Sequence, residues 1–144
     1  MTTHEEVVDC PTAWVNRHIQ TYVESGGQRG HRWNGVPTLL LTTRGRKSGK
    51  LRRTALIYGR DDGSYVVVAS IGGAPKHPSW YLNLEADPQV RLQVGPEEMI
   101  GQARIATGGE RERLWQQMAE IWPQYDQYQK KTRREIPVVV LDPA

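Results

Sequence analysis

The sequence predicts a mainly β domain with flanking helices, an α+β fold in which antiparallel strands form a small barrel. Two observations lead to this prediction. Short turn signals, among them Asp61-Asp62-Gly63 and Gly95-Pro96, join most neighbouring β-rich runs, as in hairpins. The longer segments with helical periodicity stand before the first of these runs and before the last, so helices and strands do not alternate as they do in a doubly wound sheet.

The first predicted element is a helix over about residues 11–25. Its apolar residues recur every three or four positions, Pro11 suits a first helical position, and Gly26-Gly27 ends the pattern. The apolar stripe consists of Val15, Ile19, Tyr22 and Val23. A polar, glycine-rich linker over about 26–36 then leads to the strands.

The remaining elements follow from two periodicities: apolar residues every three or four positions in helices, and alternating or continuous apolar residues in strands. In chain order they are strands over 36–43, 51–60 and 64–70, a short helix over 78–87, strands over 89–94 and 99–106, a helix over 108–122, a polar segment over 123–135 and a closing strand over 136–143. Trp14, Trp115 and Trp122 are expected in the core because they have helical spacing, with a place beside the substrate as the alternative for Trp122.

Length and composition restrict the functional classes. With 144 residues the chain is expected to form one domain over 1–144, and a net charge of +3 makes the whole molecule a weak attractor of polyanions. The single cysteine, Cys10, excludes an internal disulfide and a thiolate metal cluster, and the four histidines share no metal-ligand spacing. No apolar run reaches the ~18 residues of a transmembrane helix. We therefore expect a cytoplasmic protein; peripheral contact with the inner face of a membrane stays open.

The most unusual stretch is the basic segment TTRGRKSGKLRRT, residues 42–54. Between Arg44 and Arg53 six of ten positions are Arg or Lys, and none is Asp or Glu. A phosphate-binding P-loop is disfavoured, because only three residues separate Gly45 from Gly49 and a strand follows. The nearly neutral overall charge and the lack of an aromatic residue in the segment disfavour a nucleic-acid interface. Two interpretations are favoured over these: a solvated hairpin, or a site whose backbone N–H groups and cations bind a small phosphorylated ligand.

Three ordered motifs favour the second interpretation: LLLTTRGRKSGKLRRTAL, VVVASIGGAPKHPSWYLNL and IWPQYDQYQKKTRREIPVVVLDP. Over about residues 36–143 they resemble the deazaflavin-dependent nitroreductase family of actinobacteria. The resemblance implies a split β-barrel of the flavin-binding oxidoreductase type, with the reduced deazaflavin coenzyme F-420 as cofactor. Because that coenzyme carries a phosphodiester and a polyglutamate tail, the resemblance also implies that the basic segment binds this anionic tail.

The resemblance assigns roles to individual residues. Arg46, Lys47, Ser48 and Arg52 would contact the phosphate and tail; Thr54, Ala55 and Ile57 would run along the deazaflavin; Val68, Ala69, Ser70 and Ile71 would line its ring; Trp80 and Asn83 would close the pocket; Tyr125 and Tyr128 would stand near the substrate. Two positions depart from the family pattern. Ile71 stands where many relatives have Lys, and Trp122 stands where nitroimidazole-activating members have Tyr, so that drug activity is not implied.

The implied activity is transfer of a hydride from reduced coenzyme F-420 to an activated small-molecule acceptor: a quinone, an unsaturated lactone or enone, or a nitroaromatic compound. The cofactor carries the reactive carbon, so the protein supplies position and electrostatics. Ser70, Tyr125 and Tyr128 are the candidates to donate a hydrogen bond or relay a proton to the acceptor. Nucleic acid is not expected as a partner, and the chain is expected to be a monomer or homodimer. An FMN-dependent oxidoreductase on the same barrel, a nucleic-acid-binding barrel and a cofactor carrier without turnover remain as alternatives.

Overall fold

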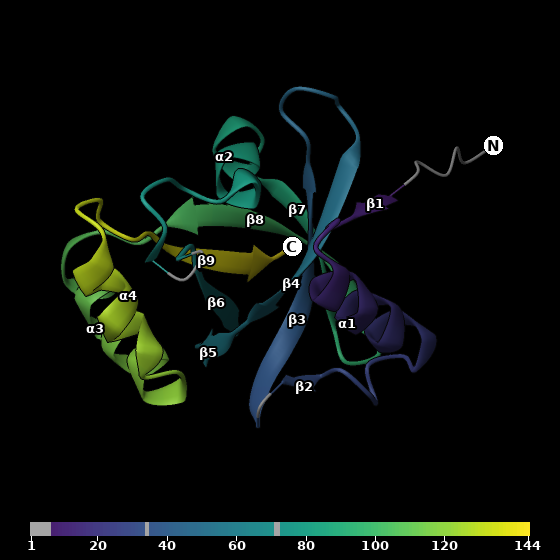
Figure 1. The fold of residues 1–144 in the computed structure, drawn as a ribbon, viewed down its shortest axis with the longest axis horizontal. Helices are drawn as coiled ribbons and strands as arrows, with labels where there is room; N and C mark the ends of the chain where they lie inside the picture. Colours follow the sequence, from purple (N-terminus) through teal and green to yellow (C-terminus); the bar gives the residue numbers. More distant parts are fainter. Residues whose placement is uncertain (1–6, 34, 71–72) are drawn as a thin grey trace.

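The computed structural model describes residues 7–33, 35–70 and 73–144, in which nine strands form one sheet and four helices pack around it (Figure 1). The strands are β1 (Val7–Asp9), β2 (Arg32–Trp33), β3 (Val36–Arg44), β4 (Leu51–Ile57), β5 (Gly59–Asp61), β6 (Ser64–Val68), β7 (Gln89–Val94), β8 (Glu97–Ile105) and β9 (Val138–Pro143). The helices are α1 (Ala13–Glu24), α2 (Ser79–Ala86), α3 (Gly108–Ile121) and α4 (Gln124–Lys131). No helix in these ranges is long and apolar enough to cross a membrane.

Antiparallel pairing dominates the sheet, and the predicted mainly β fold with flanking helices is confirmed. The strand order is β1-β4-β3-β7-β8-β9-β6-β5, with β2 paired to β3 beside this path. Every pairing is antiparallel except that of β1 with β4. Among the described residues no ladder joins β5 to β1, the two ends of this order, so the barrel is split and not closed.

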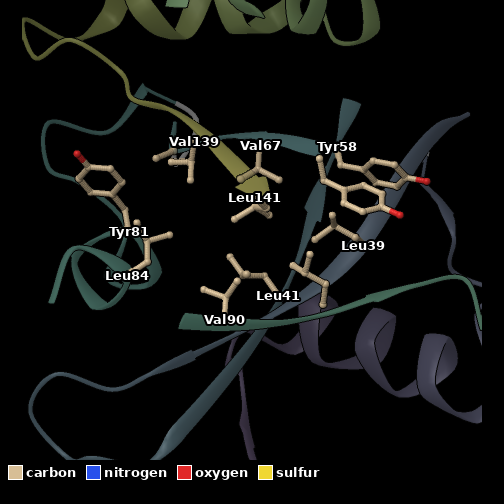
Figure 2. Close-up of a cluster of buried hydrophobic side chains, with 12 residues drawn as sticks. Leu39, Leu41, Tyr58, Val67, Tyr81, Leu84, Val90, Val139 and Leu141 are labelled. Atoms are coloured by element: carbon tan, nitrogen blue, oxygen red, sulfur yellow. The ribbon is translucent and has the colours of Figure 1, made fainter. Parts of the chain in front are cut away.

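Strands β6 and β9 are buried on both faces, which explains their continuous apolar sequences. Since alternate residues of a strand point to opposite faces, Val67 and Val139 join one core cluster while Val66 and Val140 join another. The first cluster lies between the strands; Figure 2 shows it with Leu39, Leu41, Val90, Leu141 and Leu84. The second packs against Leu114, Met118 and Tyr125 of α3 and α4, which lie side by side at the left of Figure 1. The sheet therefore fixes the position of α4.

Helix α1 is anchored on the other side of the sheet by a buried tyrosine. Ile19 and Tyr22 pack on Leu40, the β3 residue that faces away from the first cluster. The Tyr22 hydroxyl accepts a hydrogen bond from the Gly95 N–H (2.6 Å) and lies 3.1 Å from the Thr38 carbonyl oxygen, to which it donates. Burial raises the pKa of Tyr22 to about 12, so the hydroxyl stays neutral and keeps both bonds.

Three local differences from the sequence prediction have physical causes. The expected strand over 51–60 is two strands, because residues before Tyr58 pair with β3 and residues after it pair with β6. The polar segment 123–135 contains α4. Too few residues of this helix face inward to produce a repeating pattern of apolar residues in the sequence. Strands β1 and β2 are three and two residues long and show no alternation from which to predict them.

Gly27→Ala is expected to destabilise the protein much more than Gly26→Ala. Both glycines have positive φ, 84° and 61°, so each alanine would meet left-handed backbone strain. A Cβ on Gly27 would also clash with the Gly95 backbone, whereas nothing lies within 4 Å of one on Gly26. Urea unfolding should show a loss of about 1–2 kcal/mol for Gly26→Ala and about 2–5 kcal/mol for Gly27→Ala. Equal losses would contradict the packing of α1 against the β7–β8 turn.

Candidate functional site

A cavity of about 940 Å³ is lined by segments that are far apart in the sequence: β1 and the start of α1, the β3–β4 hairpin, the start of α2, and α4. Of the residues that the sequence analysis assigned to a site, it brings together Arg46, Lys47, Ser48, Arg52, Thr54, Ala55, Ile57, Val68, Ser70, Trp80, Asn83, Tyr125 and Tyr128. Ala69 is fully buried in the first core cluster and does not line the cavity. Ile71 lies outside the described residues.

The basic segment forms the tip of the β3–β4 hairpin, between the last paired residues Arg44 and Leu51. The Gly45 N–H donates to the Lys50 carbonyl oxygen (2.7 Å), and the Gly49 N–H donates to the Gly45 carbonyl oxygen (2.8 Å). Gly49 has a φ of 73°, a conformation that glycine adopts without strain. This compact turn leaves the side chains of residues 46–48 exposed at one end of the cavity.

A buried amide of α2 holds this tip in place. Asn83 is 4% exposed, and its Oδ1 accepts hydrogen bonds from the backbone N–H (3.2 Å) and the Nη1 (2.9 Å) of Arg46. Its Nδ2 donates to Oγ1 of Thr43 (3.2 Å) on β3. Asn83 lines the cavity, and these bonds use its polar atoms to position the hairpin.

Positive charge is concentrated at this end of the cavity. Within the described residues neither Lys47 nor Arg52 forms an ion pair. The neighbouring Arg53 is instead neutralised by Asp9 of β1 through a two-pronged contact, Nε to Oδ1 at 2.6 Å and Nη2 to Oδ2 at 3.1 Å. The first residues of α2, whose backbone N–H groups add partial positive charge, line the same end. An anionic group is therefore the ligand that this end suits.

The other end of the cavity is aromatic. Trp33 of β2 stacks on Trp14 of α1, with ring centres 5.8 Å apart, and also contacts Trp122 beyond α3 at 5.2 Å. Trp14 is 53% exposed, so its predicted place in the core is wrong: its helical position faces the cavity and solvent. Trp115 packs at the edge of the second cluster. Flat, apolar walls of this kind suit a planar ring.

Helix α4 contributes two tyrosines to this aromatic end. Their rings pack edge to face with centres 6.1 Å apart, and Nε1 of Trp122 donates to the Tyr128 hydroxyl (3.3 Å). Burial, and to a smaller extent the neighbouring Tyr128, raises the pKa of Tyr125 above its ordinary value. Tyr125 therefore stays a neutral O–H donor. Among the described residues, its hydroxyl makes no hydrogen bond.

The cavity thus fits an elongated ligand with an anionic end and a planar end. The residues present provide cations at one end, aromatic and aliphatic walls at the other, and Thr54, Ala55 and Ile57 of β4 along the length between them. No group of three His, Cys, Asp or Glu side chains that could hold a metal ion occurs in the described part of the chain.

Sequence reasoning did not identify Trp33, Asp9 or Arg53 as site residues. Trp33 belongs to a two-residue strand, and the Asp9–Arg53 pair joins residues 44 positions apart, so neither carries a local pattern. The one sequence signal that could have suggested the Asp9 contact is the charge of this residue, since the segment 42–54 is rich in cations and has no acidic residue of its own.

Comparison with known proteins agrees with this geometry. The family model described as F420H(2)-dependent quinone reductase matches residues 14–143. An F420H(2)-dependent quinone reductase of Mycobacterium tuberculosis strain H37Rv is 40% identical over 141 residues, covering 89% of this chain and 95% of that protein.

Solved structures give the same result. An F420-H2-dependent reductase is 46% identical with a TM-score of 0.69, over 74% of this chain and 94% of that chain. A chain described as a domain-swapped dimer is 42% identical with a TM-score of 0.72, over 92% of this chain and 100% of that chain. A haem-binding protein of Mycobacterium smegmatis, 18% identical with a TM-score of 0.59 over 86% of this chain and 49% of its own, shares the fold alone.

Asn83→Ala is expected to loosen the hairpin tip without unfolding the sheet. The change removes both contacts to Arg46 and the contact to Thr43, at a cost of about 1–3 kcal/mol. Hydrogen exchange should become faster at the Gly45 and Gly49 amides and stay slow in β7 and β8. Asn83→Asp, which keeps the acceptor oxygens, is the matched control and should retain most of the protection at the tip. Unchanged exchange in the alanine variant would show that the β3–β4 turn keeps its structure without the Asn83 contacts.

Proposed function

Because the chain belongs to the F420H(2)-dependent quinone reductase family, we propose that it is an oxidoreductase that uses reduced coenzyme F420 to reduce a quinone-type acceptor. The observation that carries the proposal is the polarity of the cavity, cationic at one end and aromatic at the other. A coenzyme with an anionic tail and a planar deazaflavin ring has the same polarity.

The hairpin tip would hold the coenzyme tail. Lys47 and Arg52 supply charge, Ser48 supplies a hydroxyl donor, and Arg46, held by Asn83, presents its backbone in a fixed place. Hydrogen bonds to charged groups contribute about 1.5–3 kcal/mol each, so each of them would strengthen binding of the coenzyme by about 10- to 150-fold. The ring would then lie along β4, beside Val68 and Ser70.

When bound, the reduced coenzyme supplies a hydride, that is, two electrons and one proton. A quinone that accepts this hydride becomes a hydroquinone only after it takes up a second proton, which comes from water. The tasks of the protein are to align the two rings, to exclude excess water and to stabilise the negative charge that grows on the acceptor oxygen.

The tyrosines of α4 suit the last task. The raised pKa of Tyr125 makes it a poor acid but a lasting hydrogen-bond donor to the acceptor oxygen. The Tyr128 hydroxyl accepts a bond from Trp122 and keeps its own hydrogen for a second acceptor. Trp33 and Trp122 would form the walls that hold the acceptor ring.

Charge reversal at the tip tests where the tail binds. Lys47→Glu and Arg52→Glu are each expected to raise the dissociation constant for the coenzyme by about 10-fold or more, because one attractive charge becomes repulsive. Fluorescence titration of the coenzyme gives the constant, and the affinity of the wild-type protein should fall as salt is added. Lys50→Glu lies in the same turn but does not line the cavity, so it should change the constant much less. Equal effects of all three variants would contradict the assigned site.

Tyr125→Phe tests the donor to the acceptor. Loss of one hydrogen bond in the transition state should lower kcat by about 10-fold or more with little change in coenzyme affinity. Since burial raises the pKa of Tyr125 above the ordinary value of about 10, the wild-type kcat should show no loss from its ionisation between about pH 7 and about pH 10. Tyr65→Phe, a buried tyrosine outside the cavity, is the control. A wild-type kcat in Tyr125→Phe would remove this role.

A further inference from the structure

We propose that Arg134 is a positioning residue: its guanidinium fixes the position of Ser70 relative to helix α4, which carries Tyr125 and Tyr128, at the wall of the cavity. This inference rests on the proposed function, because the relative position of Ser70 and α4 affects a rate only if the cavity is the site of that reaction. Arg134 lies between α4 and β9 and does not itself line the cavity. It therefore acts through the residues that it holds.

The guanidinium binds the chain that joins β6 to α2 at four points. Nη2 donates to the Ser70 carbonyl oxygen (2.7 Å), Nη1 to the Ala69 carbonyl oxygen (3.1 Å) and Nε to the Ala74 carbonyl oxygen (2.9 Å). Nη1 also lies 3.0 Å from Nδ1 of His77. Because arginine can only donate, this contact requires that Nδ1 carry no proton. One side chain thus fixes residues on both sides of positions 71–72.

The surroundings of the Arg134 guanidinium are unusual for an arginine whose only role is to stabilise the fold. Arg134 has no carboxylate partner among the described residues, and burial lowers its pKa. Taking an arginine partly out of water without a counterion is costly, and here the compensation comes from three backbone carbonyl dipoles and the imidazole of His77. The planar fork of arginine matches several acceptors at fixed angles, which an ammonium group cannot do.

The same residue is tied to α4. The Gln129 side chain donates through Nε2 to the Arg134 carbonyl oxygen (2.8 Å) and accepts through Oε1 from the Ile136 N–H (2.9 Å). Gly73 packs directly on the helix: a Cβ there would lie 2.6 Å from the carbonyl oxygen of Tyr128. Movement of the β6–α2 connection would therefore reach α4, and the reverse also holds.

These contacts connect two of the segments that would face the reacting rings. Ser70 lines the cavity from the chain after β6, and Tyr125 and Tyr128 line it from α4. Because a trans peptide holds its N–H opposite its C=O, capture of the Ala69 carbonyl also fixes the direction of the Ser70 N–H. A misplacement of about 1 Å between such groups can lower a rate by about 100-fold.

The experiment compares Arg134→Gln and Arg134→Lys with two controls. Arg133→Gln removes the adjacent exposed arginine, and Arg111→Gln removes a different side chain that donates to the same segment, at the Ile136 carbonyl oxygen (2.7 Å). Hydrogen exchange is measured on all variants without coenzyme. Coenzyme affinity is measured by fluorescence titration, and kcat is measured with a quinone.

For Arg134→Gln we expect faster exchange at the Ala69 and Gly73 amides, a coenzyme dissociation constant within about 3-fold of wild type, and a kcat lower by about 10- to 100-fold. Arg134→Lys keeps the charge but not the fork and should recover only part of kcat. Both controls should keep wild-type kcat and wild-type exchange at Ala69 and Gly73.

Three results would overturn the proposal. The first is faster exchange at Ala69 and Gly73 with unchanged kcat, and the second is a loss of kcat in Arg111→Gln equal to that in Arg134→Gln. The third is unchanged exchange in Arg134→Gln, since Arg134 would then not hold the segment. Failure of the proposed function is seen separately, as a wild-type protein that neither binds nor consumes the reduced coenzyme.

Discussion

The site depends on keeping positive charge concentrated, and free to meet a ligand, at the tip of one hairpin. Like charges repel one another, so the turn needs an ordering contact that does not neutralise them. Asn83 provides it, because its uncharged amide binds the backbone and guanidinium of Arg46 from α2. Arg53 shows the alternative outcome: Asp9 neutralises it, and the pair ties β1 to β4. An amide partner thus leaves the cations of the tip available to a ligand, whereas a carboxylate partner uses the charge of Arg53 to join two strands.

The two ends of the cavity differ in dielectric environment, and their chemistry follows from this. Exposed cations act through water, where their attraction is long-ranged but weakened by salt. Around Tyr125, which is buried, a single hydrogen bond is stronger and an unwanted charge is more costly. The raised pKa of Tyr125 is useful in this setting. An ionised phenol would repel the negative charge that a hydride brings to the acceptor, whereas a neutral one stabilises it.

The sequence predicted those parts of the molecule whose pattern is local. The double-sided burial of β6 and β9 appears as continuous β-branched runs, and the basic tip appears as six cations in ten positions. Helix α4 was missed because its inward face consists of little more than Tyr125 and Tyr128 in a polar segment. The aromatic wall and the Arg134 contacts were missed because they join residues that only the folded chain brings together, Trp14 with Trp33 and Arg134 with Ser70. The assignment of individual residues to cofactor and acceptor came from family resemblance, and it is a proposal that geometry supports.

The cavity is lined by residues of β1, α1, the β3–β4 hairpin, α2 and α4, so no single element forms it. Any molecule that fills it acts as a non-covalent cross-link between segments as distant as Asp9 and Tyr128. By mass action, occupancy favours the folded chain over the unfolded one, in proportion to the logarithm of ligand concentration. The supply of coenzyme in a cell would then govern the lifetime of this protein against heat and proteases, as well as its turnover.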